Sequence, residues 1–136
     1  MDKIKITWTQ TCYSKINYKT DYYFYAFSRG NQLLYLGYSK KQHVKDEIKQ
    51  NINRVLKKNT RGISIWLGEI TDTSFGRLSK QIILDTEALL IYKNQPLYNK
   101  LLKKSYNGRE NLKILSINMP YMFKQASFSS NKWRYQ

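Results

Sequence analysis

The sequence holds 136 residues, 41% of them hydrophobic, which fits one globular domain with its own core and argues against intrinsic disorder. Its single cysteine, Cys12, excludes an intrachain disulfide and a cysteine-rich zinc site. Twenty-four Lys and Arg against nine Asp and Glu give a net charge of +15, a field that attracts polyanions. No apolar run approaches the roughly 20 residues that a membrane span needs, and the N-terminus lacks the apolar stretch of a signal peptide, so we expect a cytoplasmic protein with no membrane partner.

The N-terminal part of the chain predicts three strands. Residues 3–8 (KIKITW) alternate polar and apolar side chains, a period that favours a short strand. Residues 21–27 (DYYFYAF) and 33–38 (LLYLGY) are rich in aromatic and aliphatic side chains, and the turn-forming residues 28–31 separate them. This pattern predicts a β-hairpin.

Two helices and a further strand follow the hairpin. Ser39 has the character of an N-cap, and an apolar stripe at spacings of three and four predicts a helix from there to about Lys58. Residues 62–70 (GISIWLGEI) alternate again and predict a strand. Residues 78–93 predict a second helix, which Pro96 terminates.

Beyond a turn signal, residues 111–118 (NLKILSIN) predict a last strand, whereas residues 121–136 show no periodicity. We therefore expect an α/β fold of the α+β type, in which helices flank a small, mostly antiparallel sheet, in the order β-ββ-α-β-α-β. A single domain would span residues 1–120. The C-terminal tail would then either dock on this domain or reach for a partner.

Basic residues are concentrated in the first predicted helix and its flanks, where Asp46 and Glu47 are the only acidic residues between positions 40 and 61. A basic surface interleaved with aromatic rings suits phosphate contact and base stacking. We therefore expect a nucleic-acid partner, DNA in preference to RNA. A membrane surface or an acidic protein is the alternative partner for such a surface. The expected nucleic-acid-binding residues are Lys40, Lys41, Lys49, Arg54, Lys57 and Lys58.

Two spaced signatures lie in the hairpin and the second helix. The hairpin strands carry YFY at 23–25 and YLG at 35–37, and Glu87 in the helix is followed twelve positions later by Asn99, the last residue of PLYN. Over residues 22–99 the chain resembles the GIY-YIG nuclease family. That family has Gly-Ile-Tyr and Tyr-Ile-Gly on paired strands, and a helix glutamate followed by an asparagine.

The resemblance implies a divalent-metal-dependent endonuclease that hydrolyses phosphodiester bonds in DNA. Glu87 would bind a single Mg²⁺ or Mn²⁺ ion, as carboxylates commonly do. Tyr25 would orient or deprotonate the attacking water, Tyr35 would face the same site, and Asn99 would hydrogen-bond within it or to a phosphate. Each residue also has a purely structural interpretation: the tyrosines pack on the sheet, the glutamate is an exposed helix residue and the asparagine belongs to a turn.

Lys45 falls where the family has an arginine, and a shift of two residues would place Glu47 there instead. Lysine keeps the positive charge but lacks the planar fork that grips a phosphate through two hydrogen bonds. His43, the only histidine, lies at the start of the same helix and could exchange a proton near neutral pH, or could simply be a surface residue. The alternative function is a catalytically inactive domain that serves as a nucleic-acid-binding or interaction module.

Overall fold

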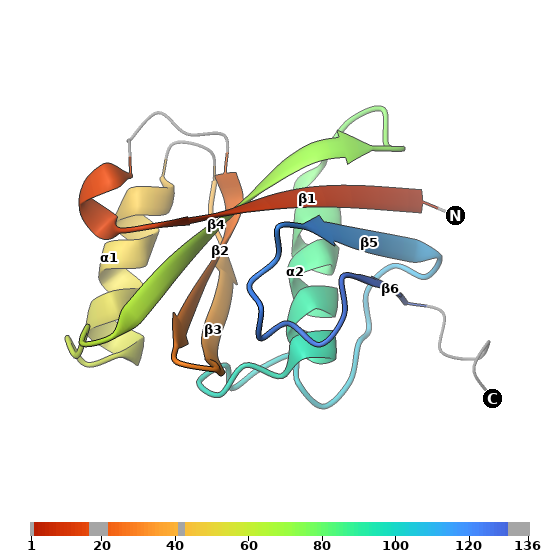
Figure 1. Ribbon diagram of the computed structural model, residues 1–136. Helices are drawn as coiled ribbons and strands as arrows, with labels where there is room; N and C mark the ends of the chain where they lie inside the picture. The colour runs from red at the N-terminus through yellow and green to blue at the C-terminus, as the bar shows by residue number, and fades with distance from the viewer. Residues whose placement is uncertain (1, 17–21, 41–42, 131–136) are drawn as a thin grey trace.

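The structure is a computed structural model that describes residues 2–16, 22–40 and 43–130. Within these residues, six strands form one sheet and two α-helices pack against it, which makes the protein an α+β fold (Figure 1). The strands are β1 (Asp2–Thr11), β2 (Tyr22–Arg29), β3 (Gln32–Tyr38), β4 (Ile63–Thr73), β5 (Leu112–Ile117) and β6 (Ser127–Ser129). The helices are α1 (Val44–Val55) and α2 (Lys80–Asn94), and a 3₁₀ turn, η1 (Tyr13–Lys15), follows β1.

The strands lie side by side in the order β3-β2-β4-β1-β5-β6. Neighbouring strands are antiparallel except β1 and β5, which run parallel. The sheet is therefore mixed, and it is larger than the small, mostly antiparallel sheet expected from the sequence. The parallel pair joins strands from opposite ends of the chain, a long-range pairing that local periodicity does not encode. β6 was not expected, because three residues are too few to show a period.

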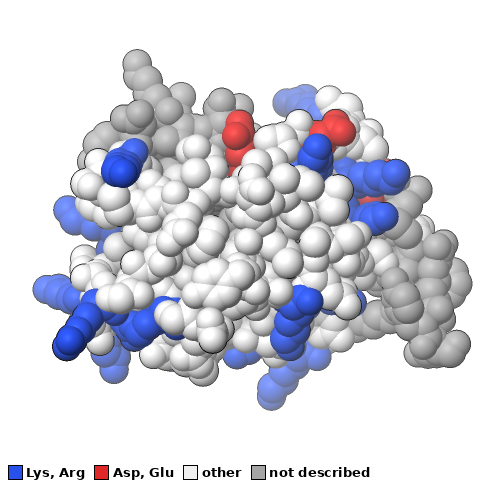
Figure 2. Space-filling view, viewed as in Figure 1, with Lys and Arg blue, Asp and Glu red and all other residues white. Residues whose placement is uncertain are grey.

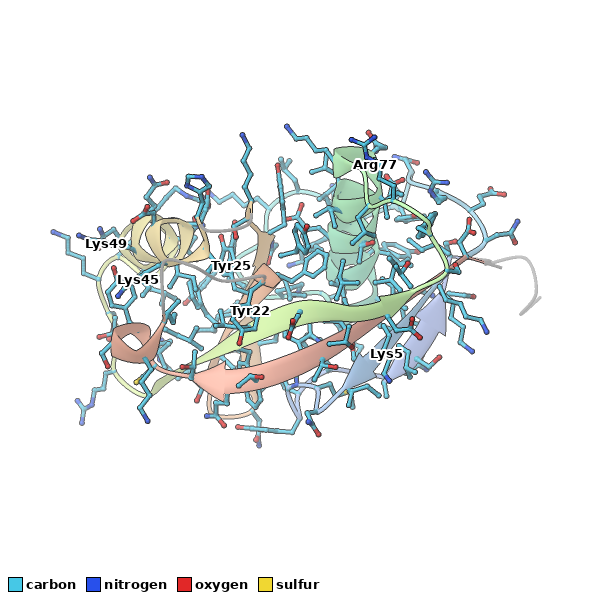
Figure 3. All side chains as sticks on the ribbon, turned by 90° about the horizontal axis from the view of Figure 1, so that it is seen from above. Lys5, Tyr22, Tyr25, Lys45, Lys49 and Arg77 are labelled. Atoms are coloured by element: carbon cyan, nitrogen blue, oxygen red, sulfur yellow. The ribbon has the colours of Figure 1, made fainter. Side chains whose placement is uncertain are left out.

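Side chains along β2 alternate between two cores, because successive residues of a strand point to opposite faces of the sheet. Phe24 and Ala26 pack in a cluster with α2, which also receives Ile114 from β5. Tyr25 and Phe27 pack in a cluster with α1. The two helices thus cover opposite faces at the β3–β2 end of the sheet, and in Figure 3 these strands lie between them.

Helix α1 starts later than the sequence indicated. Its N-cap position is His43, and no side chain caps it. The backbone N–H of Ser39 donates to the carbonyl of Tyr23 at 2.9 Å, which holds Ser39 in the extension of the hairpin. Ser39 is therefore not an N-cap, and α1 begins five residues after it, at Val44.

The other helix boundaries have identifiable local causes. α1 ends at Val55, and Lys57 and Lys58 both have positive φ angles, 50° and 65°, which are incompatible with a continuing helix. α2 starts two residues later and ends one residue later than expected. Its cap is Ser79, whose hydroxyl oxygen accepts a hydrogen bond from the backbone N–H of Ile82 at 3.2 Å.

The segment after residue 120 docks on the domain as far as the structure describes it. Phe123 and Phe128 are buried in the cluster beneath α2, and the hydroxyl of Tyr121 donates to the carbonyl of Gly30. Residues 131–136 of the expected tail lie outside the described residues.

The face formed by β1 and β5 is seen in Figure 2, where Lys and Arg side chains spread around its edge and outnumber the acidic ones. This distribution agrees with the net charge of +15. Within the described part of the chain, no helix is long and apolar enough to cross a membrane.

Candidate active site

A cavity of about 670 Å³ lies between α1 and the β2–β3 hairpin, and α2 contributes one side chain to it. Most of the side chains around it are polar or charged. They are Tyr25, Tyr35, Tyr38, Ser39, Lys40, His43, Asp46, Glu47, Gln50, Asn51, Arg54 and Glu87, with Gly37 beside them. Phenol hydroxyls, carboxylates and a guanidinium group therefore share one open cavity, and acid–base and ion-binding sites use this combination of groups.

Tyr25 reaches this cavity through the space that a glycine leaves open. Its position on β2 directs it toward α1, between the two helices (Figure 3), and only 1% of it is exposed. Gly37 is its partner across the hairpin. A Cβ atom on Gly37 would lie 2.6 Å from the hydroxyl oxygen of Tyr25 and from its Cζ atom, a steric clash. The tyrosine can occupy this position because residue 37 has no side chain.

One face of α1 supplies a hydrogen-bonded network to the cavity. Glu47, Asn51 and Arg54 are spaced four and three residues apart, so they lie on one side of the helix. The buried Asn51 amide donates to the hydroxyl of Tyr25 and, at 3.4 Å, to the carboxylate of Glu47. The Asn51 carbonyl accepts from Arg54 at 3.1 Å and 2.6 Å, and Arg54 also donates to the hydroxyl of Tyr35 at 3.2 Å. Asn51 is the centre of this network.

Glu87 is the side chain of α2 that lines the cavity. Burial is the main cause that raises the pKa of Glu87 to about 7; the negative charge of Glu47 adds to it, and a hydrogen bond from the backbone N–H of Tyr38 opposes it. A carboxyl group with this pKa changes its charge near neutral pH. Such a group can exchange a proton or accept a cation under physiological conditions.

The two tyrosine hydroxyls stay protonated at neutral pH. Burial raises the pKa of Tyr25 well above its usual range, and the neighbouring Tyr35, Glu47 and Glu87 raise it further. Burial also raises the pKa of Tyr35, although the positive charge of Arg54 opposes the shift. In this protein, therefore, both hydroxyls act as hydrogen-bonding groups and not as bases, unless a cation binds beside them.

Half of the residues singled out from the sequence line the cavity, and Lys40 and His43 lie at its exposed rim. The residues that line it are Tyr25, Tyr35, Lys40, His43, Arg54 and Glu87. Lys57 and Lys58 do not line it and are exposed beyond the end of α1. Lys41 lies outside the described residues.

Lys45 and Lys49 lie on the flank of α1 that faces away from Tyr25 (Figure 3). The ammonium group of Lys45 is 5.1 Å from the centroid of the Tyr13 ring. Lys49 lines a separate cavity of about 340 Å³ with Tyr13. Glu47, and not Lys45, lines the main cavity.

Asn99 is buried and forms hydrogen bonds with the backbone of β3. Its side-chain oxygen accepts from the N–H of Leu36, and its side-chain amide donates to the carbonyl of Leu36, both at 2.9 Å. The preceding residues 97–98 donate backbone hydrogen bonds to residues 33–34. Asn99 therefore fixes the strand that ends at Tyr38, instead of lining the cavity itself.

Sequence reasoning missed Asn51 and attached no positive role to Glu47. The signal was present, because Glu47, Asn51 and Arg54 recur at the spacing of one helix face. The lysines of the same segment obscured this pattern, because Lys45 and Lys49 lie on the opposite flank of the helix.

The acidic residues of the cavity suit a divalent cation. Glu47 and Glu87 are close enough for the charge of one to raise the pKa of the other, and Mg²⁺ commonly binds through one or two carboxylates while it keeps several waters. The residues described by the structure contain no group of three or more His, Cys, Asp or Glu that could hold a metal ion. Among the described residues, the carboxylates that line the cavity are those of Glu47, Glu87 and the exposed Asp46.

No protein-family model, no curated protein and no solved structure matches this chain.

Proposed function

We propose that the protein is a divalent-metal-dependent endonuclease of the GIY-YIG type that hydrolyses phosphodiester bonds in nucleic acid, DNA in preference to RNA. The observation that carries this proposal is the convergence of Glu87, the hydroxyls of Tyr25 and Tyr35, and Arg54 on one cavity. Phosphodiester hydrolysis needs a group that binds a cation, a group that holds the phosphate and groups that orient water.

Glu87 and Glu47 would hold the cation, since both carboxylates face the cavity. A bound Mg²⁺ or Mn²⁺ ion neutralises charge on the phosphate and lowers the pKa of a coordinated water. The raised pKa of Glu87, about 7, means that its proton must leave before the ion binds, so binding would release a proton near neutral pH.

Arg54 would hold the phosphate. Its guanidinium group offers a planar set of donors that matches phosphate oxygens, and its bonds to Asn51 and Tyr35 fix its orientation. In this arrangement Arg54 takes the place that sequence counting gave to Lys45. Lys40 adds a second positive charge at the rim.

Tyr25 would orient the attacking water. Its hydroxyl is held by Asn51 and, being protonated, can both donate and accept a hydrogen bond. His43 at the rim of the cavity would give a proton to the leaving oxygen or take one from water, since the two nitrogens of an imidazole ring can donate and accept hydrogen bonds.

A nuclease assay tests this proposal. Plasmid, linear, branched and single-stranded DNA, and RNA, are incubated with the native protein and Mg²⁺ or Mn²⁺, with EDTA as control. We expect cutting that needs the cation and that falls on the order of 100-fold or more in Glu87→Gln and in Arg54→Lys. The matched controls Glu110→Gln and Lys45→Ala change charge outside the cavity and should leave the rate nearly unchanged.

Two outcomes would contradict the proposal. Cutting that persists in EDTA or in Glu87→Gln would place the activity elsewhere, or in a contaminant. Salt-sensitive binding of nucleic acid without cutting in any condition would instead identify the chain as a catalytically inactive nucleic-acid-binding module.

A further inference from the structure

A second cavity, of about 250 Å³, adjoins the first and shares Tyr38, Ser39 and Lys40 with it. We propose that this second cavity, the side pocket, receives one unpaired nucleobase next to the phosphate held in the main cavity. The preferred substrate would then be single-stranded nucleic acid, or an unpaired stretch within a duplex. This inference rests on the proposed function, because it assigns a substrate class to the same site.

The walls of the side pocket suit a flat aromatic ring. Tyr23 and Tyr38 line it from the hairpin, and Leu78 and Ile83 line it from the start of α2. Ile83 belongs to the hydrophobic cluster beneath α2, and Tyr23, Tyr38 and Leu78 pack against that cluster. Aromatic and aliphatic surfaces of this kind bind nucleobases by stacking, whatever the sequence.

The rim of the side pocket complements a phosphate backbone. Lys40 and Lys80 line it, and none of its lining residues is acidic. Lys40 lies between the two cavities, since it lines both of them. A strand that placed a base in the side pocket would therefore lay an adjacent phosphate across Lys40, toward Arg54 and Glu87 in the main cavity.

The size of the side pocket limits what can enter it. Its volume of about 250 Å³ is below the roughly 300–1,000 Å³ of pockets that enclose drug-sized ligands, so it suits a single ring system. A base in a duplex would have to leave the stack first, which costs free energy that an unpaired base does not require. This cost produces the preference for unpaired substrate.

Binding to a matched pair of oligomers tests the side pocket without relying on cutting. The native protein, in EDTA, is titrated with a labelled single-stranded DNA 8-mer, with an abasic 8-mer of the same backbone charge, and with the 8-mer as a duplex. We expect the intact strand to bind about 5- to 100-fold tighter than the abasic one, and tighter than the duplex. In Leu78→Trp, whose larger side chain fills the pocket, the difference between intact and abasic strands should disappear.

A surface variant covers the case in which Leu78→Trp fails to fold. Lys80→Gln should lower the salt dependence of single-strand binding by about 0.7 in the slope of log K against log salt. Lys104→Gln, beyond the other end of α2, should leave that slope unchanged. Equal binding of intact and abasic strands, a duplex bound as tightly as the single strand, or no effect of Lys80→Gln would each overturn the inference. None of these results depends on cleavage, so a failed nuclease assay is a separate outcome.

Discussion

Replacing Glu87 with Gln changes how the stability of the metal-free protein depends on pH. Glutamine keeps the shape of the side chain and an oxygen that can accept from the N–H of Tyr38, but it cannot ionise. The folded protein raises the pKa of Glu87 from 4.5 to about 7. The contribution of protonated Glu87 to the stability of the folded protein is therefore fully present below pH 4.5. This contribution is lost as the pH rises through about 7.

The size of this loss follows from the shift in pKa. The pKa changes from 4.5 to about 7, and one pKa unit corresponds to about 1.4 kcal/mol. The carboxylate should therefore destabilise the native protein by about 3 kcal/mol at pH 8 relative to pH 4. Since Gln carries no such penalty, Glu87→Gln should gain stability over the native protein by this amount across the same range.

Urea unfolding in EDTA, followed at several pH values between 4 and 8, measures the difference. Both proteins share every other titrating group, so their difference in unfolding free energy isolates Glu87. The charge of Glu47 contributes to the shift, so the pH-dependent difference should shrink when the comparison is repeated in a Glu47→Gln background. A difference that stays constant from pH 4 to 8 would show that Glu87 is not held in a buried, charge-penalising position, and the site would need another description.

Three further predictions test the geometry of the site. Gly37→Ala should destabilise the protein by about 1–3 kcal/mol, because the new Cβ would clash with the ring of Tyr25; Gly76→Ala, which meets nothing within 4 Å, is the control in thermal unfolding, and equal effects would contradict the packing. Asn99→Ala should lower the free energy of unfolding by about 2–4 kcal/mol in urea, because it leaves the N–H and the carbonyl of Leu36 without their side-chain partner. A negligible change would contradict this role of Asn99. Mg²⁺ should bind about tenfold tighter at pH 8 than at pH 6 by calorimetry, since it competes with a proton of pKa about 7. An affinity independent of pH would show that Glu87 is not a ligand of the metal.

Much of the fold was open to prediction because its central elements carry strong local signals. The expected strand at 21–27 and the helix at 78–93 agree with β2 and α2 to within two residues, since an aromatic β-prone run and an apolar helical stripe are both local patterns. The start of α1 was wrong because Ser39 has the right side chain for a cap, while its backbone N–H pairs with Tyr23. The preference of a single residue for an N-cap position is weaker than such a tertiary hydrogen bond.

The candidate site was harder to predict, because its members come together only through tertiary packing. The resemblance pointed to Tyr25, Tyr35 and Glu87, which do line one cavity. The rotation of α1 about its axis could not be inferred from the stripe alone. Asn51 is buried whereas the apolar Ile52 is only partly buried, so the helix turns its polar network, and not its lysines, toward the cavity.

The charges on the cavity side of α1 are ordered along the helix, with Glu47 in the first turn and Arg54 in the last. The interaction of each charge with the helix dipole stabilises the helix by about 0.3–1 kcal/mol, so helix stability alone favours this order. The helix dipole does not account for the buried Asn51 between these two residues. It also does not account for Glu87, which lines the same cavity from α2. Asn51 links the acidic and basic groups to the hydroxyl of Tyr25. In the proposed hydrolysis, Glu47 would bind the cation and Arg54 would bind the phosphate, while the hydroxyl of Tyr25, held by Asn51, would orient the water.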